Sequence, residues 1–444
     1  MDFHGYKNLC LACLTALALA CSRQHAAVPP QPRPVEVQVL KPRLTPEPPA
    51  TPEQAALKQK LETQLTADHP THRLTLRNHR VVEGQVVTET PTTIMLREDF
   101  GYSGSIISAY RRTDIAAVET LCSNTCEVTH QDIALAEQFP SFHFAKVPPY
   151  SMVTDAPYAD VERTLRLLAQ LREQFERRFA ALVRPNHAPK NIQIVFFSTE
   201  EPFRTYTRKV APALVGSAGF YSASENRLVL LNQLGTAQYA TVQDRLAQRR
   251  RALDSRPDID PDDRHQASTR LATLKSEMTF EAKAMTERLV RHEGAHQLFA
   301  AYGIQSRYGV EPTWLSEGLA QYCEPSEIGG YHFALAERLG KARNEHRLLP
   351  LATILNHRDA AGFFSLGEQN VETAYAQSWA LTYFLMQGPQ RVRFFDYIKS
   401  LRDIGTDKAA IAAYKSEPAT LLLRALATDS NTLETQWLQF VTRL

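Results

Sequence analysis

The sequence lacks a strong excess of charge of either sign, and this absence limits the kinds of partner. Acidic and basic residues nearly cancel to a formal net charge of +2, so no overall field predicts binding to nucleic acid. No internal repeat is visible, and no hydrophobic run beyond the N-terminus is long enough to span a membrane. The full chain has 444 residues, of which 43% are apolar. This length and composition are enough for two or three domains with at least one sizeable core.

The first residues have the pattern of a secretion signal. Lys7 precedes a weakly apolar run from Leu9 to Ala20, which has the length of a signal-peptide core. The run ends Leu17-Ala18-Leu19-Ala20-Cys21, which resembles a bacterial lipobox, in which the cysteine is lipidated and becomes the mature N-terminus. We therefore expect residues 1–21 to be a lipoprotein signal and Cys21 to anchor the protein to the bacterial cell envelope, facing the periplasm or exterior. The alternative is an ordinary secretory signal with an incidental cysteine.

Cysteine is scarce in the rest of the chain. Of six cysteines, two would leave with the signal and Cys21 would carry lipid. Cys122 and Cys126 could close a very small disulfide loop, since an extracytoplasmic compartment permits disulfides. Cys323 is left without a partner, and we expect a buried thiol.

The segment after Cys21 changes character twice. Residues 22–70 begin rich in proline, which favours an extended, semi-rigid stalk, and a short helix is expected near its end. Residues 71–122 then alternate apolar and polar residues in short runs separated by turn residues, a pattern typical of antiparallel strands. This pattern resembles small SH3-like or Sm-like β-barrels, and a docking or structural module is its simplest interpretation.

The remainder, residues 140–444, has the pattern of an α+β domain. Leucines at helical spacing predict a helix near Tyr158–Leu182, and Ile192–Phe197 and Arg227–Leu231 are strand candidates, the second paired with Gly219–Tyr221. Residues 239–286 are highly charged, with an acidic, proline-containing centre between helix-forming flanks. We expect a helical hairpin inserted on the rim of the domain and covering a cleft. The C-terminal half is expected to be mostly helical.

A helix predicted over Met285–Tyr302, ended by Gly303, contains His292-Glu293-Gly294-Ala295-His296. Residues four apart share a helix face, so the imidazoles of His292 and His296 can reach one metal ion. Glu293 is then placed to act on water at the metal rather than on the metal itself. The alternative is two partly exposed histidines on a surface helix.

A third ligand is expected downstream, within Trp314-Leu315-Ser316-Glu317-Gly318-Leu319-Ala320-Gln321-Tyr322. Trp-Leu-x-Glu-Gly-x-Ala-x-Tyr, about twenty residues after the His-Glu-x-x-His pattern, resembles the second zinc helix of gluzincin peptidases. The match is closest to peptidase-MA-like domains of bacterial extracytoplasmic proteins. The resemblance implies a thermolysin-like fold, Zn²⁺ as the cofactor, His292, His296 and Glu317 as ligands, and Glu293 as general base. Glu311 and Glu324 are the alternative third ligands.

Two further residues are candidates for roles beside the metal ligands. Gln321 lies one turn after Glu317 and could accept a hydrogen bond from a zinc histidine, or it could be an ordinary surface residue. The segment Ala374–Leu381 resembles a helix that follows the zinc helices in related aminopeptidases, where a tyrosine stabilises the oxyanion. The resemblance assigns that role to Tyr375. The usual glycine three residues later is Ser378 here, and a packed aromatic residue is the alternative for Tyr375.

Taken together, the patterns predict a membrane-anchored extracytoplasmic zinc metallopeptidase, with a weak preference for endopeptidase activity because no motif for a free amine is visible. A peptide or protein is the expected substrate. Two alternatives stay open: a zinc-stabilised envelope scaffold that binds without cleaving, and a zinc hydrolase acting on a non-peptide substrate.

Overall fold

The structure is a computed structural model, and it describes residues 51–444 except for 69–70, 100–104, 121–127, 185–186, 188, 190, 257, 307–310, 358–361, 389 and 406. The predicted signal, Cys21 and most of the proline-rich segment lie outside the described residues, as do Cys122 and Cys126. Among the helices that are described, none is both long and apolar enough to cross a membrane.

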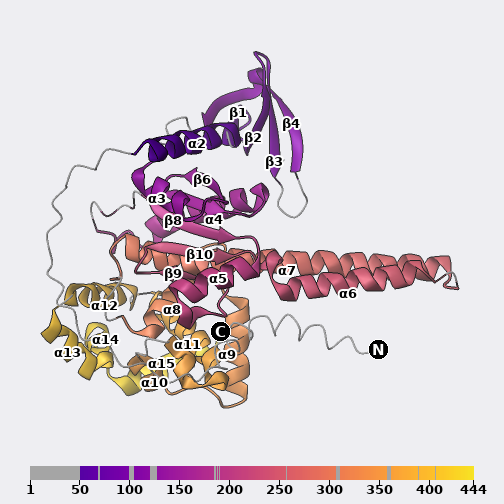
Figure 1. Cartoon of the computed structure of the whole chain (residues 1–444). Coiled ribbons are helices and arrows are strands. Elements are labelled where there is room, and N and C mark those ends of the chain that lie inside the picture. The colour runs from indigo at the N-terminus through magenta and orange to yellow at the C-terminus, as the bar shows by residue number, and fades with distance from the viewer. Residues whose placement is uncertain are drawn as a thin grey trace.

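An antiparallel sheet of five short strands forms the N-terminal part, where the alternating pattern predicted strands. Its order is β4-β3-β2-β1-β5 (Figure 1). The preceding helix α2 (Pro52–Asp68) contacts residues 130–138 and 143–147, and its Leu61 is buried in the core there. Alternate side chains, including Leu74 and Leu96, point to one face and form a small core. Within the described residues no ladder joins the edge strands β4 and β5, so closure into a barrel stays a prediction. The strands are β1 (Thr71–Leu76), β2 (Val81–Glu89), β3 (Thr93–Asp99), β4 (Ser105–Arg111) and β5 (Ile115–Thr120).

A second sheet of five strands lies at the centre of the molecule (Figure 1). Its order is β6-β7-β8-β10-β9; the β7–β8 and β8–β10 pairs are parallel, and both edge pairs are antiparallel. The expected strands near residues 192–197, 219–221 and 227–231 are confirmed. The strands are β6 (His143–Val147), β7 (Tyr150–Thr154), β8 (Ile192–Phe197), β9 (Gly219–Ser222) and β10 (Arg227–Leu231).

Helices cover both faces of this sheet, which explains why β8 and β10 are almost continuously apolar. In β8, Ile194 and Phe196 pack in the large core with α4 (Tyr158–Arg178) and the inner part of α7, while Val195 and Phe197 pack in a second core with α3 (His130–Gln138) and α5 (Glu200–Val210). The inner part of α7 is therefore packed against one face of this sheet.

A long helical hairpin projects from the body (Figure 1). Its arms are α6 (Ala237–Asp254) and α7 (Pro261–Ala301). The hairpin itself was expected, but its second arm and the helix with the His-Glu-x-x-His pattern form one continuous helix of 41 residues. Helix α7 ends where Gly303 adopts a left-handed φ of 63°, as its position predicted.

The rest of the chain is helical, so the fold is α+β with a mostly helical C-terminal half. Helix α8 packs against both α7 and α11. Short 3₁₀ turns lie at residues 112–114, 212–214, 233–235 and 362–366. The helices are α8 (Thr313–Tyr322), α9 (Phe333–Asn344), α10 (Leu351–Asn356), α11 (Glu368–Leu385), α12 (Gln390–Ile404), α13 (Lys408–Ser416), α14 (Pro418–Leu426) and α15 (Ser430–Val441).

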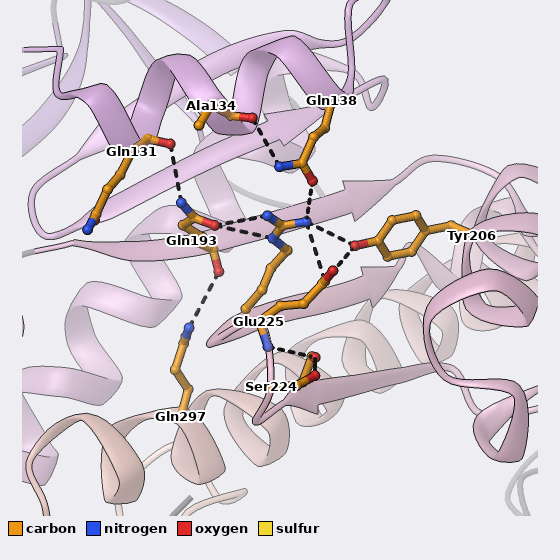
Figure 2. A network of polar contacts seen from close by, with 10 residues as sticks. Gln131, Ala134, Gln138, Gln193, Tyr206, Ser224, Glu225 and Gln297 are labelled. Atoms are coloured by element: carbon orange, nitrogen blue, oxygen red, sulfur yellow. Dashed lines mark hydrogen bonds and ion pairs between the residues drawn. The ribbon is translucent and has the colours of Figure 1, made fainter. Parts of the chain in front are cut away.

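A buried polar network fixes the sheet to its surrounding helices (Figure 2). The buried guanidinium of Arg227 donates to Gln193, Gln138 and Tyr206. Gln297, directly after His296 on α7, donates to the backbone oxygen of Gln193 at 3.4 Å. Because these buried polar side chains are hydrogen-bonded to one another, the network stabilises the position of α7 over the sheet.

Candidate metal centre

The inner part of α7 brings His292 and His296 together, as their spacing predicted. Their rings lie edge to face with centroids 4.9 Å apart, and their Nε2 atoms are 3.2 Å apart. Gly294 lies between them against α4, where a Cβ atom would come within 2.9 Å of Leu168. A glycine here lets the helix lie close to α4.

Helix α8 supplies Glu317. Its carboxylate oxygens lie 3.4 Å from His292 Nε2 and 3.8 Å from His296 Nε2. The next residue, Gly318, is where α8 crosses α11, because a Cβ atom there would lie 2.5 Å from the backbone oxygen of Ser378. This close crossing fixes α8 at a position where the Glu317 carboxylate lies beside both histidines.

These three side chains form the group that could hold a metal ion among the described residues, with their ligand atoms within 4.8 Å of one another. Two ligands about 2.1 Å from a tetrahedral ion lie roughly 3.4 Å apart. The two Nε2 atoms are 3.2 Å apart, one Glu317 oxygen lies 3.4 Å from His292 Nε2 and the other lies 3.8 Å from His296 Nε2, all close to this spacing. Glu317 therefore belongs with His292 and His296 to the group that could hold a metal ion.

Glu324 links the site to a third histidine, His332, and lies outside the group that could hold a metal ion. His332 accepts the Leu335 N–H at Nδ1, so its Nε2–H donates to Glu324 at 2.7 Å. The other oxygen of Glu324 accepts from His292 Nδ1 at 2.8 Å. This tautomer leaves the His292 Nε2 lone pair free for a metal. Burial opposes ionisation of Glu324, but the hydrogen bonds from both histidines lower its pKa to about 2.

The segment after α8 is held in place by Arg291, the residue before His292. Its buried guanidinium donates to the backbone oxygen of Cys323 and to Gln174, both at 2.9 Å. Gln174 in turn accepts the Ile328 N–H and donates to the Ser326 backbone oxygen. These bonds position Glu324 against His292. Cys323 is a buried thiol, as expected.

Burial and the neighbouring carboxylates shift the pKa values of the two histidines in opposite directions. Burial alone would lower the pKa of His292, but Glu317 and Glu324 raise it well above its ordinary value. For His296 burial dominates and lowers the pKa to about 4. Protons and a metal compete for the same Nε2 atom of His292, so metal binding at this site is expected to weaken as the pH falls.

Glu293 faces the same site from α7. Its Oε2 accepts the backbone N–H of Tyr221 in the edge strand β9 at 3.0 Å. Burial raises the pKa of Glu293 to about 7, although His292 opposes the shift. A carboxylate with a pKa near neutrality is suited to accept and release a proton.

The site opens into a cavity of about 540 Å³. Its walls come from β9, α7, α8, α9 and α11, and Tyr375 on α11 is part of the wall. The Tyr375 ring packs edge to face on Phe363, with the ring centroids 5.3 Å apart, so its position fits both the packing and the oxyanion interpretations.

No described residue between 237 and 284 lines the cavity. The hairpin therefore does not cover the cleft, because its arms extend away from the body (Figure 1).

Two expectations from the sequence are corrected here. Gln321 was a candidate partner for a zinc histidine, but its buried Oε1 has no hydrogen-bond partner, and Glu324 fills that role. Glu311 was an alternative ligand, but it accepts the Ser306 N–H at 2.8 Å and lies outside the group that could hold a metal.

The roles of Glu324 and His332 were missed, since neither belongs to a recognisable motif. One signal was available: a helix N-cap histidine shortly after a glutamate.

A family described as "Protein of unknown function (DUF1570)" matches residues 286–405. The matched segment contains His292, His296, Glu317, Glu324 and Tyr375. No curated protein matches the chain. The family description states no activity, so the chemistry must be inferred from the site itself.

Proposed function

We propose that this protein is a zinc-dependent hydrolase, specifically an extracytoplasmic metallopeptidase of the gluzincin type. The observation that carries the proposal is the arrangement of His292, His296 and Glu317 around one point, with Glu293 beside them. In this proposal the first three residues hold the zinc and Glu293 is the general base.

The donor set supports zinc over the harder cations. Two imidazole nitrogens and one carboxylate oxygen suit zinc, whereas calcium and magnesium prefer oxygen ligands alone. Three protein ligands also leave one tetrahedral position open, which is typical of catalytic zinc sites. Bound zinc supplies Lewis-acid chemistry, since it acidifies water and polarises a carbonyl oxygen.

Glu293 performs the proton transfers in this proposal. The Tyr221 N–H holds Oε2, which leaves Oε1 to take the proton from the attacking water. The same carboxyl then delivers that proton to the leaving amine, because a group with a pKa of about 7 releases it readily. Tyr375 is proposed to donate its hydroxyl to the oxyanion. Tyr375→Phe should then lower kcat by about 10²–10³ with little change in KM; an unchanged kcat would leave Tyr375 as packing only.

The position of β9 favours a peptide over a non-peptide substrate. β9 is an edge strand of the central sheet, and Gly219, Phe220 and Tyr221 line the cavity. Extended peptides bind to exposed sheet edges through backbone hydrogen bonds. A peptide lying along β9 would pass directly beside Glu293.

The location of the protein is also a proposal. A lipid on Cys21 would anchor the chain to a bacterial membrane, and the proline-rich segment would separate the anchor from the folded part. Cys21→Ser should release the protein from membranes. Intact-mass analysis of the mature form that found another N-terminal residue would leave ordinary secretion.

The activity is tested with the purified full chain in detergent and a diverse peptide library, with and without a zinc chelator. We expect cleavage by the wild type that the chelator abolishes and added zinc restores. Glu293→Gln should keep zinc but lose turnover, since it removes a base and not a ligand. The matched control is Glu281→Gln, an exposed glutamate on the same helix, which should cleave like the wild type. Stoichiometric zinc without cleavage of any peptide would instead support the scaffold alternative.

A further inference from the structure

The cavity at the metal centre contains two arginines that the proposed hydrolysis does not use. Arg288 lies on α7 one turn before His292, so it shares the face of the metal histidines. Arg338 lies on α9, the helix that His332 caps. Each arginine thus comes from a helix that also contributes to the metal site.

Neither arginine has an anionic partner within the described part of the chain. No ion pair joins Arg288 or Arg338 to any described carboxylate, whereas the nearby Arg291 donates hydrogen bonds to Cys323 and Gln174. Glu372 lines the same cavity, but it pairs with neither, and its Oε1 is buried without a hydrogen-bond partner. Two half-buried guanidinium groups in one cavity lose part of their hydration. An anion bound to them in this cavity would replace that hydration.

The geometry points to a substrate with an acidic group. We propose that Arg288 and Arg338 bind a carboxylate of the substrate peptide, either its C-terminus or an aspartate or glutamate side chain. A guanidinium presents parallel N–H groups that match the two oxygens of a carboxylate. This inference rests on the proposed peptidase function for its substrate class, but the binding step itself needs no turnover.

The test measures binding in the zinc-loaded Glu293→Gln full chain, which is not expected to cleave. Four pools of N-acetylated octapeptides are used, with glutamate or glutamine placed at each position in turn and with a free or an amidated C-terminus. Equilibrium dialysis followed by mass spectrometry gives the bound fraction of each peptide. We expect at least one carboxylate-bearing pool to bind roughly tenfold more tightly than the neutral, amidated glutamine pool. Comparison of the pools shows whether the side chain or the C-terminus is bound.

Adding Arg288→Gln or Arg338→Gln should remove most of that preference and leave binding of the neutral pool unchanged. The matched controls are Arg270→Gln on α7 and Lys341→Gln on α9, which remove one exposed positive charge from the same helices outside the cavity. Equal binding of all four pools, no binding of any pool, or equal losses in the control variants would overturn the inference.

The two proposals fail in different ways. Preferential binding of acidic peptides without cleavage by the wild type would refute the peptidase function and keep the carboxylate site. Cleavage of neutral and acidic peptides at equal rates, unaffected by either arginine substitution, would refute the carboxylate site and keep the peptidase function.

Discussion

The two halves of helix α7 differ sharply, although they belong to one continuous helix. In the outer half, residues 261–281, no described side chain is buried, and the partner arm α6 likewise has no buried residue. In the inner half, residues 282–301, Val290, Ala295, Leu298 and Phe299 are buried in the large core. The two metal histidines and Glu293 all lie in the inner half.

This difference shows what stabilises each half. The outer half depends on local interactions: Asp260 caps its first turn, and Tyr239 and Thr279 share a hydrogen bond across the hairpin. The inner half is fixed by the sheet and by α4 and α8. A metal site requires ligands held to fractions of an ångström, and only the packed half supplies that rigidity. The outer half should open locally at much lower cost in free energy.

The largest expected effect comes from removing a core side chain in the inner half. Phe299 is fully buried, and its ring contacts Phe175 and Phe179 at 4.8 and 5.0 Å. Phe299→Ala should lower the free energy of unfolding by about 3–5 kcal/mol, measured by denaturant unfolding. A loss below about 1 kcal/mol would mean that the inner half is not packed as described.

The next effect concerns pH and the half-buried Glu293. Its pKa rises from an ordinary 4.5 to about 7 in the folded protein, so the folded state binds more protons between these values. The zinc-free protein should therefore lose stability as pH rises from about 4.5 to 7, by at most about 3 kcal/mol from this residue. Glu293→Gln should remove this slope when unfolding is measured in chelator. Parallel pH profiles for the two proteins would contradict the raised pKa of Glu293.

A smaller effect is expected where the inner half meets the segment after α8. Glu324→Gln keeps the shape of the side chain but removes the negative charge that His292 and His332 share. Loss of such support for a metal ligand typically weakens metal affinity by about 10–100-fold. Zinc competition with a chromophoric chelator measures the change. An unchanged affinity in Glu324→Gln would remove the positioning role.

The smallest effects belong to the outer half. Phe280 is 49% exposed, and Phe280→Ala should change the free energy of unfolding by less than about 1 kcal/mol. It is the matched counterpart of Phe299→Ala on the same helix. Replacing residues 256–264 with a short Gly/Ser linker should likewise leave zinc bound. If either change unfolds the inner half, the two halves form one cooperative unit.

Much of this arrangement could be predicted from the sequence, for identifiable reasons. The five strands of the N-terminal sheet and strands β8, β9 and β10 followed from alternation or from short apolar runs, whereas β6 and β7 were not predicted. Gly303 correctly marked the end of α7. His292, His296 and Glu317 could be grouped because helical spacing and a short intervening segment constrain them. Local patterns were sufficient wherever the partners were close in sequence.

Other features could not be predicted because they depend on tertiary contacts. The charged residues before Met285 gave no sign that they continue the metal helix without a break. Glu324 contacts His292 across 32 positions of sequence, and only the Arg291 and Gln174 hydrogen bonds place it there. Gln321 had the correct helical spacing to face the site, yet the neighbouring segment places Glu324 closer.

The central claim is tested most directly by the zinc content of purified variants, measured by elemental analysis alongside circular dichroism. The wild type should contain about one zinc per chain, and Glu293→Gln should contain the same amount. His292→Ala, His296→Ala and Glu317→Ala should each lose the metal while the folded signal of the hairpin and sheets remains. A folded Glu317→Ala protein with full zinc would contradict the assignment of Glu317 as the third ligand, and a zinc-free wild type that cannot be reconstituted would contradict the metal centre itself.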